Sequence, residues 1–562
     1  METIVSIGNQ GFDRLREEGS FYIDKTYFIK EWWESRDVIT LITRPRRFGK
    51  TLNMNMLYCF FSNQYADRED LFEGLTIWKD EKYRSIQGTY PVIYLSFADV
   101  KQTNYKDAVL KIKKIITDVY QQYIELAGWE GLTEVQVRQF QSVDPYMDDV
   151  TAQCALKDLS GYLYRYYEKK VIILLDEFDT PMQEAYIHGY WDEFTAFIRS
   201  LFNAAFKTNP YLNRAMMTGI TRVSKESIFS DLNNLKVVTT TSEEYATCFG
   251  FTQEEVFTAL EEFQLAGQKD AVKQWYDGFT FGSQRDIYNP WSITNYLKEK
   301  KLLAYWASTS SNDLINRLIQ TSKPDVKEFM EELLNEREIV LNFDEQIVFD
   351  QLETKENAIW SLMVASGYLK IDKIEYRGIL HVPWYHLKIT NLETLGMFSE
   401  MFVGWFQNTR SNYNAFIKAM LCGNIKEMNA YMNEVALATF SSFDTGSHPS
   451  GRTQPERFYH GFVLGLLVEL RDQYEVRSNR ESGYGRYDVM LIPRQKNQLA
   501  FVLEFKVYDA QEELKLEDTV QSALVQIEEK DYDTELIERG ISKSKIRHYG
   551  FAFEGKRVLI GE

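Results

Sequence analysis

The chain has 562 residues and a formal net charge of −18 at pH 7. This length exceeds what one hydrophobic core organises, so three domains are predicted. Hydrophobic residues at 44% and aromatic residues at 15% are typical of an ordered globular protein and exclude a disordered one. The acidic balance argues against constitutive coating of nucleic acid, because proteins that coat it present a basic face. Contact with nucleic acid is therefore expected to be local, or confined to one state of the protein.

Cysteine usage and hydropathy narrow the class further. The four cysteines are scattered without a Cys-x-x-Cys pair, so neither a disulfide framework nor a zinc site is predicted. The first residues lack the basic and apolar regions of a signal peptide, and no apolar stretch approaches the roughly 18 residues that span a bilayer. These features predict a cytoplasmic protein without a membrane partner.

Residues 1–285 alternate between strand and helix patterns. Alternation of this kind predicts an α/β fold with a parallel sheet and helices on both faces. A long helical insertion with one apolar stripe is expected between the second and third strands. The strands are predicted at 38–42, 91–96, 171–175 and 214–219, and the stripe comprises Val109, Ile112, Ile116, Val119 and Tyr123.

The segment 44–51, Arg-Pro-Arg-Arg-Phe-Gly-Lys-Thr, follows the first strand and precedes an amphipathic helix. Strand, loop, Gly-Lys-Thr and helix is the order that a phosphate-binding loop requires. Lys50 is expected to reach the β- and γ-phosphates of ATP, and the Thr51 hydroxyl to reach Mg²⁺. Arg44 stands where such loops usually have their first glycine, and its Cβ is expected to restrict the loop. The other residues predicted to hold the phosphates through the helix N-terminus are Arg46, Arg47, Phe48 and Gly49.

An acid pair follows the apolar run 171–175, which is typical of a central parallel strand. Asp176 is predicted to hold Mg²⁺ through water, and Glu177 to polarise the attacking water. The alternative is a strand that ends in a solvated acid pair, which the nearby Gly-Lys-Thr sequence disfavours.

The strand at 214–219 leads into a further polar group. Thr218 or Thr221 occupies the place where ATPases with a phosphate-binding loop of this kind often have a residue that senses the γ-phosphate. Arg222 is predicted either to stabilise charge on the phosphates or to form a structural salt bridge. The sequence leaves both pairs of alternatives open.

Residues 286–440 are predicted to form a helical lid or connector. Asn289 is expected to cap a helix that has Pro290 in its first turn. Tyr288 and Trp291 either line the nucleotide pocket or pack the lid. Residues 441–451 have the composition of a linker. Helices are expected at 311–318, 325–334, 356–366 and 392–409, with strand-like pieces at 368–371 and 381–388.

Residues 455–562 are predicted to form a third domain in the order helix, strand, strand–turn–strand, helix, strand. Asp488 opens an apolar run, and a second strand at 499–507 carries Glu504 and Lys506. Side chains two apart on a strand share a face, so Glu504 and Lys506 are expected to point the same way. A hairpin would bring Asp488 beside them. Two carboxylates with an ammonium group suit phosphodiester hydrolysis assisted by Mg²⁺ or Mn²⁺.

This arrangement resembles the PD-(D/E)xK nuclease superfamily. The resemblance implies a restriction-endonuclease-like α/β core in which Asp488 and Glu504 bind metal and Lys506 orients or activates water. It also implies that Glu469 is an accessory acid on a preceding helix, and that Gln526 lies on the polar helix that follows the core. The alternative is a surface strand that carries a glutamate and a lysine by chance.

The N-terminal motifs resemble the bacterial AAA-ATPase-like family, whose members are commonly fused to a C-terminal domain of the PD-(D/E)xK type. The resemblance implies an AAA+-related ATPase module joined to a predicted nuclease. It rests on the segments 21–26, 44–51, 175–181, 218–229, 275–279 and 288–292.

Two hypotheses follow. The leading one is an ATP-binding and hydrolysing module coupled to a metal-dependent nuclease, with DNA favoured over RNA and the oligomeric state left open. The alternative is a nucleotide-dependent switch whose C-terminal domain binds nucleic acid or protein without cleavage. A peptide-remodelling ATPase is disfavoured because the sequence has no evident pore-loop motif.

Overall fold

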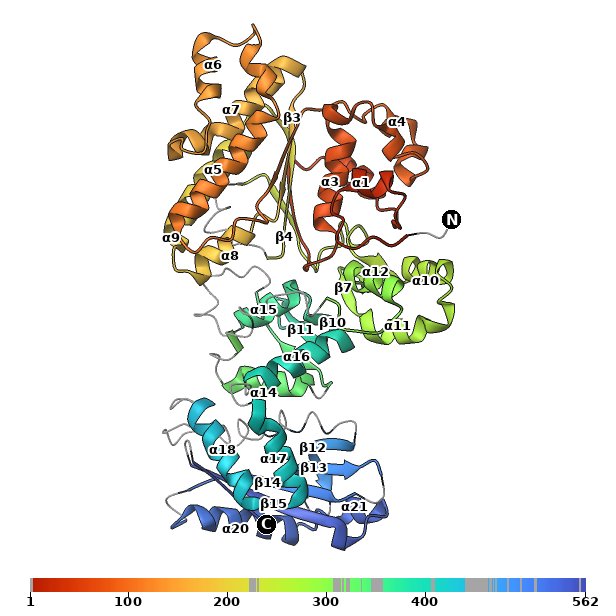
Figure 1. Cartoon of the computed structure of the whole chain (residues 1–562), viewed down its shortest axis with the longest axis vertical. Coiled ribbons are helices and arrows are strands. Elements are labelled where there is room, and N and C mark those ends of the chain that lie inside the picture. Colours follow the sequence, from red (N-terminus) through yellow and green to blue (C-terminus); the bar gives the residue numbers. More distant parts are fainter. Residues whose placement is uncertain are drawn as a thin grey trace. The chain divides into compact units, whose positions relative to one another are not determined.

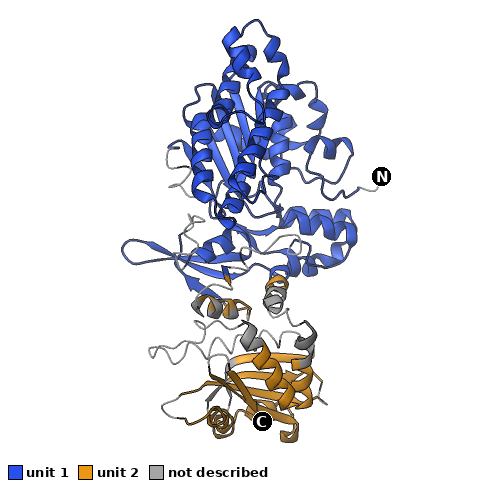
Figure 2. Ribbon diagram, turned by 60° about the vertical axis from the view of Figure 1, so that its left-hand side comes forward, with its two compact units in different colours: residues 1–318, 338–394 blue, residues 319–337, 395–562 orange. Residues whose placement is uncertain are grey.

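The computed structural model divides the chain into two compact units (Figure 2). Unit 1 comprises residues 1–318 and 338–394, and unit 2 comprises residues 319–337 and 395–562. The chain therefore passes from one unit to the other three times. The described residues are 4–221, 229, 232–306, 315, 318–319, 324–334, 336–344, 357–405, 410–439, 463, 467, 470, 473–482, 485–495, 498–509, 513–554 and 557–562.

A parallel five-stranded sheet forms the centre of the N-terminal part of unit 1. Its strand order is β2-β3-β4-β1-β5, so β1, the strand before the predicted phosphate-binding loop, lies next to β4, and β4 separates it from β3. The four predicted strands are confirmed, and β5 was not predicted. The bounds are β1 Ile39–Thr43, β2 Val92–Ser96, β3 Val171–Asp176, β4 Leu212–Gly219 and β5 Leu235–Val238.

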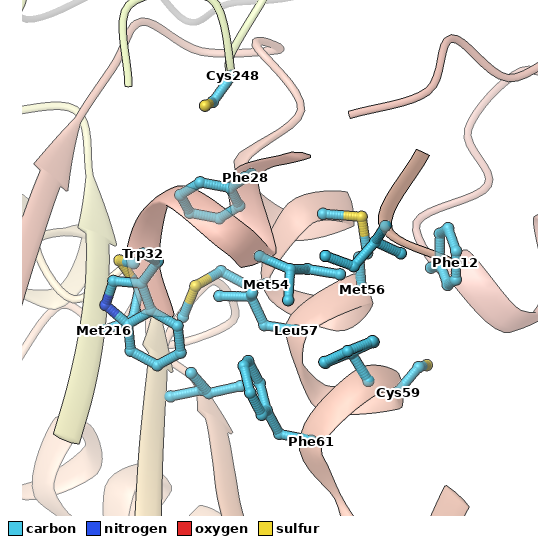
Figure 3. Close-up of a cluster of buried hydrophobic side chains, with 14 of the residues drawn as sticks. Phe12, Phe28, Trp32, Met54, Met56, Leu57, Cys59, Phe61, Met216 and Cys248 are labelled. Atoms are coloured by element: carbon cyan, nitrogen blue, oxygen red, sulfur yellow. The ribbon is translucent and has the colours of Figure 1, made fainter. Parts of the chain in front are cut away.

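Helices cover both faces of this sheet, as predicted (Figure 1). One face carries α1 (Phe12–Glu17), α2 (Tyr27–Ser35) and α3 (Lys50–Phe61), whose apolar side chains pack with Met216 of β4 (Figure 3). The other face carries the predicted insertion, and all five residues of its apolar stripe are buried. The remaining helices of this part are α4 Glu81–Arg84, α5 Tyr105–Gln121, α6 Glu134–Gln141, α7 Asp149–Tyr167, α8 Thr180–Ile187 and α9 Trp191–Phe202.

The rest of unit 1 contains two small sheets, with strand orders β6-β8-β7 and β10-β11-β9. The helix predicted at Asn289 is confirmed, because the Asn289 side chain accepts hydrogen bonds from the backbone N–H groups of Trp291 and Ser292. The bounds are β6 Phe251–Thr252, β7 Phe279–Phe281, β8 Gln284–Tyr288, β9 Ile339–Leu341, β10 Leu369–Arg377, β11 Val382–Ile389, α10 Gln253–Glu262, α11 Lys269–Tyr276, α12 Pro290–Glu299 and α15 Ala358–Ala365.

Two helices begin unit 2 or lead into it. They are α14 (Pro324–Leu334), which begins one residue before the helix predicted at 325–334, and α16 (Leu392–Trp405), which falls within the helix predicted at 392–409. The helix predicted at 311–318 lies almost wholly outside the described residues, and the linker predicted at 441–451 lies wholly outside them.

Unit 2 is built on a mixed sheet with strand order β12-β13-β14-β15-β16, in which only β14 and β15 run parallel. The predicted strands occur in the predicted order, and β16 is additional. The bounds are β12 Tyr474–Ser482, β13 Gly485–Pro493, β14 Ala500–Val507, β15 Ile546–Glu554, β16 Arg557–Gly561, α17 Arg410–Cys422, α18 Ile425–Thr439, α20 Leu516–Glu529 and α21 Thr534–Glu538.

Helices α17 and α18 pack on one face of this sheet, and α20 packs on the other. Helix α18 also closes the sheet edge. The Asn433 side chain pairs with the N–H and C=O of Val558, and the Asn429 side chain pairs with those of Ile560. An edge strand with satisfied backbone groups is protected from pairing with other chains. Both helices lie within residues 286–440, the range that the sequence assigned to a lid or connector.

Candidate functional site

The loop predicted to bind phosphate, residues 44–49, connects the end of β1 to the start of α3. Its left-handed residues are Arg47 (φ 65°) and Gly49 (φ 79°), and α3 begins without a hydrogen bond from a capping side chain. The first N–H groups of an uncapped helix are available to an anion. Lys50 is buried, and its Nζ donates to the backbone oxygens of Arg44 at 3.0 Å and Pro45 at 2.8 Å. Burial lowers the pKa of Lys50.

Asp176 joins the loop to the carboxyl ends of β3 and β4. Its Oδ2 accepts from the Thr51 hydroxyl at 2.7 Å, and its Oδ1 accepts from the Thr218 hydroxyl at 2.5 Å. Burial raises the pKa of Asp176. The structure thus brings Thr51, Asp176 and Thr218 together at one edge of the parallel sheet.

Glu177 follows directly, in a left-handed conformation with φ 50°. Its N–H donates to the Thr218 hydroxyl at 3.4 Å, and its Oε2 accepts from the Thr180 hydroxyl at 3.2 Å. The side chain is half-buried. Glu177 therefore lies beside the Asp176–Thr218 pair, at the same end of the sheet.

Asp179 is a further buried acid at this edge that sequence reasoning missed. Its Oδ2 accepts from the N–H groups of Ile220 at 2.9 Å and Thr221 at 2.8 Å, and from the Thr221 hydroxyl at 3.0 Å. Thr221 is therefore engaged by Asp179, whereas Thr218 contacts Asp176. Arg222, the predicted charge-stabilising arginine, lies outside the described residues. The signal for Asp179 was its place three residues after Asp176.

Arg44 points into the protein. It is 0% exposed, and its guanidinium donates to the backbone oxygens of Thr43 and Thr239 at 2.9 and 2.7 Å. It also lies 4.5 Å from the centre of the Phe281 ring, and burial lowers its pKa to about 10. Arg44 thus ties the end of β1 to the segment that follows β5. The left-handed residues of the loop are Arg47 and Gly49, and Arg44 is not among them.

Residues 279–306 hold the outer part of the loop. The Arg46 carbonyl accepts from Asn289 Nδ2 at 3.3 Å and from the Trp306 indole N–H at 3.1 Å. The Arg47 guanidinium lies 4.2 Å from the centre of the Trp291 ring. Asn289, Trp306 and Trp291, all outside the parallel sheet, therefore hold this loop.

Aromatic packing adds to this hold. The Phe48 ring packs edge-on against Phe279 and Phe281, with ring centres 4.8 and 5.4 Å apart. Tyr288 is buried in the core formed by α10, α11 and α12, so packing is its role, whereas Trp291 covers a loop arginine.

Asp277 and Asp286 form a pair of acids close in sequence to the residues that hold this loop. Burial, together with the neighbouring Asp286, raises the pKa of Asp277 to about 6, and Asp277 Oδ1 accepts from the Gly278 N–H at 2.6 Å. Because the pKa of Asp277 is higher in the folded than in the unfolded protein, the protonated carboxyl favours folding at low pH. This contribution to stability is lost as the pH rises from about 4, the pKa in the unfolded chain, through about 6, the pKa in the folded protein.

We therefore predict that Asp277→Asn stabilises the protein by about 1 kcal/mol at pH 8, after discounting for solvent screening. The amide keeps the acceptor for Gly278, so only the charge is lost. Thermal unfolding of the variant and the wild type between pH 4 and pH 8 measures this. Equal pH dependence in the two proteins would contradict the shift, and Asp118→Asn, an exposed change on α5, controls for a general loss of negative charge.

The second group of predicted residues lies in the sheet of unit 2. Val489 pairs with Leu503 between antiparallel β13 and β14, so Asp488 lies opposite Glu504. Asp488 Oδ2 accepts from the Phe505 N–H at 2.8 Å. Leu503 and Phe505 belong to the core that α17 and α18 cover. Because faces alternate along a strand, Glu504 and Lys506 share the opposite face, beneath α20.

Glu504 is 3% exposed and contacts α20, because its Oε1 accepts from the Gln526 amide. The same amide donates to the Tyr532 hydroxyl at 3.2 Å. Burial raises the pKa of Tyr532, and the charges of Glu504 and Asp488 add to this effect. Tyr532 is thus a member of the cluster that sequence reasoning missed. Glu469, the predicted accessory acid, lies outside the described residues.

The donor set suits a hard cation. Within the part of the chain that is described, no three His, Cys, Asp or Glu side chains form a metal-binding group, and Asp488 with Glu504 provides two carboxylates. Mg²⁺ is commonly held by one or two carboxylates, with water and substrate phosphate completing its octahedron. Asp488 and Glu504 therefore fit a cation that shares its ligands with a phosphodiester.

Two parts of the chain match the models of two protein families. Residues 6–229 match a family described as a predicted AAA-ATPase, and residues 454–562 match the PD-(D/E)XK nuclease superfamily. The chain thus combines a predicted AAA-ATPase domain with a PD-(D/E)XK superfamily domain, as its motifs indicated. It is also similar to an Azotobacter chroococcum mcd 1 protein described as an uncharacterized protein in the vnfD 5' region. The identity is 24% over 560 residues, covering 95% of this chain and 94% of the relative.

None of the helices described here combines the length and the apolar character needed to cross a bilayer.

Proposed function

We propose that the protein is an ATP-regulated, divalent-metal-dependent nuclease that acts on nucleic acid, with DNA the favoured substrate. One observation carries the proposal: Asp488 and Glu504 lie opposite each other on adjacent strands, and Lys506 shares the face of Glu504. The Gln526 amide further fixes the Glu504 carboxylate. An arrangement fixed by packing and hydrogen bonds is what a catalytic site requires.

Each side chain has a role in this proposal. Asp488 and Glu504 would hold Mg²⁺ or Mn²⁺, which when bound supplies Lewis-acid stabilisation of phosphate charge. Lys506 would orient the attacking water through its ammonium group. The accessory acid Glu469 remains part of the proposal as the sequence predicted it.

The ATPase half has its own proposed roles. Lys50 and the N–H groups at the start of α3 would bind the phosphates of ATP, and the loop residues Arg46, Arg47, Phe48 and Gly49 would surround them. Thr51 and Asp176 would hold the accompanying Mg²⁺, and Thr218 would sense the γ-phosphate. Glu177 would polarise water, and Arg222 would stabilise phosphate charge.

A chain of buried hydrogen bonds supports regulation by ATP. The Trp306 indole binds the Arg46 carbonyl of the phosphate loop, and the Trp306 backbone N–H donates to Glu393 Oε1 at 2.5 Å. Glu393 is 0% exposed, and its Oε2 also accepts from the Ser292 hydroxyl at 2.9 Å. Glu393 lies in the first turn of α16, the helix through which the chain passes from unit 1 to unit 2. A shift of the loop would therefore bias this helix.

The alternative is a nucleotide-dependent switch that binds nucleic acid or protein without cutting. The net charge of −18 favours it slightly, because cleavage requires close approach to a polyanion. Metal binding separates the two hypotheses, since a switch needs no cation between Asp488 and Glu504.

We expect the wild-type protein to bind Mn²⁺ in calorimetric titrations and Asp488→Asn to weaken that binding at least about tenfold, because one of two carboxylates is lost. Glu538→Gln, an exposed change on α21, is the matched control. A wild-type protein that binds no Mg²⁺ or Mn²⁺ at this site and cuts neither DNA nor RNA, with or without ATP, would favour the switch.

A further inference from the structure

Strands β10 and β11 form a ribbon that extends beyond its own sheet (labelled in Figure 1). They pair from Leu369 with Ile389 to Arg377 with Val382. The third strand, β9, pairs only with Tyr385 to Leu387 of β11. Residues 376–384 are therefore a two-stranded projection, supported on neither side by a further described strand.

The tip of this projection is apolar. Ile379 is 98% exposed and Leu380 is 86% exposed, and both lie in the turn between the strands. Tyr376 on the adjoining strand is 63% exposed. Residues of this size are ordinarily tolerated singly on a surface, whereas an exposed group of them marks an interaction site. Gly378 and His381, with φ 71° and 49°, bend the turn so that Ile379 and Leu380 project.

The ribbon contains more basic than acidic residues. Residues 369–389 contain four lysine or arginine residues and two acids, in a chain whose net charge is −18. Both acids are engaged within unit 1: Glu375 pairs with Arg377 at 2.9 Å, and Asp372 pairs with Lys388 at 2.8 Å. Arg377 also stacks over Trp384, with the guanidinium 4.5 Å from the ring centre. The four cations exceed the two acids, so the ribbon has a net charge of +2. Arg377 is the cation nearest the tip, and Lys370 lies opposite Lys388 at the other end of the ribbon.

We propose that the β10–β11 ribbon is a DNA-binding arm. Lys373 and Arg377 contact backbone phosphates, and Ile379 and Leu380 insert between adjacent base pairs of a duplex. The charge of the ribbon favours a polyanion over a second copy of this acidic chain. Apolar wedges that unstack a base step and bend the duplex are an established use of such side chains. The proposal rests on the proposed function in taking DNA as the substrate.

The test uses full-length protein with Lys506→Ala, so that DNA is bound without being cut. A 30-base-pair duplex carries 2-aminopurine, which brightens on unstacking. Ile379→Ser with Leu380→Ser is expected to abolish the brightening and weaken binding at least about tenfold, which corresponds to about 1.4 kcal/mol. Lys373→Ala with Arg377→Ala is expected to reduce the slope of log K against log salt concentration by the equivalent of about one to two phosphate contacts.

Tyr146→Ser is the control, because Tyr146 is 87% exposed and lies before α7, outside the ribbon. Unchanged affinity and fluorescence in the tip variant would overturn the arm. So would a change of the tip variant from oligomer to monomer in light scattering, which would assign the tip to contact between copies. Cleavage by the protein with native Lys506 is measured separately. If it cuts DNA while the tip variant binds normally, the arm fails and the nuclease stands; if wild type neither binds nor cuts, both fail.

Discussion

Replacing Lys506 with alanine is expected to reduce cleavage of DNA by the full-length protein at least about a hundredfold. Lys506 follows Glu504 by two residues on β14, so its ammonium group lies on the face that carries the two carboxylates. Removing it leaves the carboxylates in place but takes away the positive group that we propose orients the attacking water. Gel-based cleavage of duplex and single-stranded DNA with Mg²⁺ or Mn²⁺, with and without ATP, measures the effect.

Two comparisons make this result specific. Lys543→Ala removes an exposed lysine from the same unit, and it should cleave like the wild type. Lys506→Ala should retain Mn²⁺ binding in calorimetric titrations, because both carboxylates remain. A variant that cleaves at the wild-type rate would exclude Lys506 from the chemistry. If Lys506→Ala loses both metal binding and cleavage, Lys506 has a structural role.

Lys50→Met is expected to lower ATP affinity and turnover at least about a hundredfold and to remove any effect of ATP on cleavage. The side chain lies buried at the N-terminus of α3, where its Nζ donates to two loop carbonyls. Methionine preserves most of the volume but cannot donate to a phosphate. Equilibrium binding of a fluorescent ATP analogue and phosphate release measure the two losses.

A stability measurement must accompany that variant. The Arg44 and Pro45 carbonyls lose their donor, which costs about 1–3 kcal/mol when buried acceptors stay unpaired. Thermal unfolding therefore shows whether the fold survives, and Lys30→Met on the exposed face of α2 gives the matched control. ATP turnover unchanged in a folded Lys50→Met protein would refute the phosphate-loop assignment.

Local sequence patterns predicted the parts of the fold that depend on hydrophobic periodicity. The continuous apolar run of β3 and the stripe of α5 are buried because each element packs between others. The Asn289-Pro290 helix start was equally predictable, since a capping side chain and a proline in the first turn act locally. The strand pair that brings Asp488 opposite Glu504 followed from alternation and a short turn.

Features that depend on distant partners were not predictable. Strand β5 has only four residues, and it is defined by pairing with β1. No role was predicted for Asp179 or Tyr532. Asp179 acts through contacts with Ile220 and Thr221, which follow β4, and Tyr532 acts through a contact with Gln526 of α20. From the sequence, Arg44 was interpreted as an unfavourable replacement of the first glycine of the loop. In the structure its guanidinium is buried against the Phe281 ring and donates to the Thr239 carbonyl, which explains an arginine at this position. Periodicity does not show which sheet an amphipathic helix covers. The sequence therefore placed the residues of α17 and α18 in a lid or connector and not on the sheet of unit 2.

The repeated passage of the chain between its units has a consequence for synthesis. Trp306 binds Glu393, which the ribosome adds 87 residues later. The loop 44–49 is made earlier, and its surroundings are complete only when that carboxylate has been added. On the proposed function, nucleotide is therefore expected to stabilise nascent chains only once residue 394 has left the exit tunnel, before the C-terminal sheet is complete.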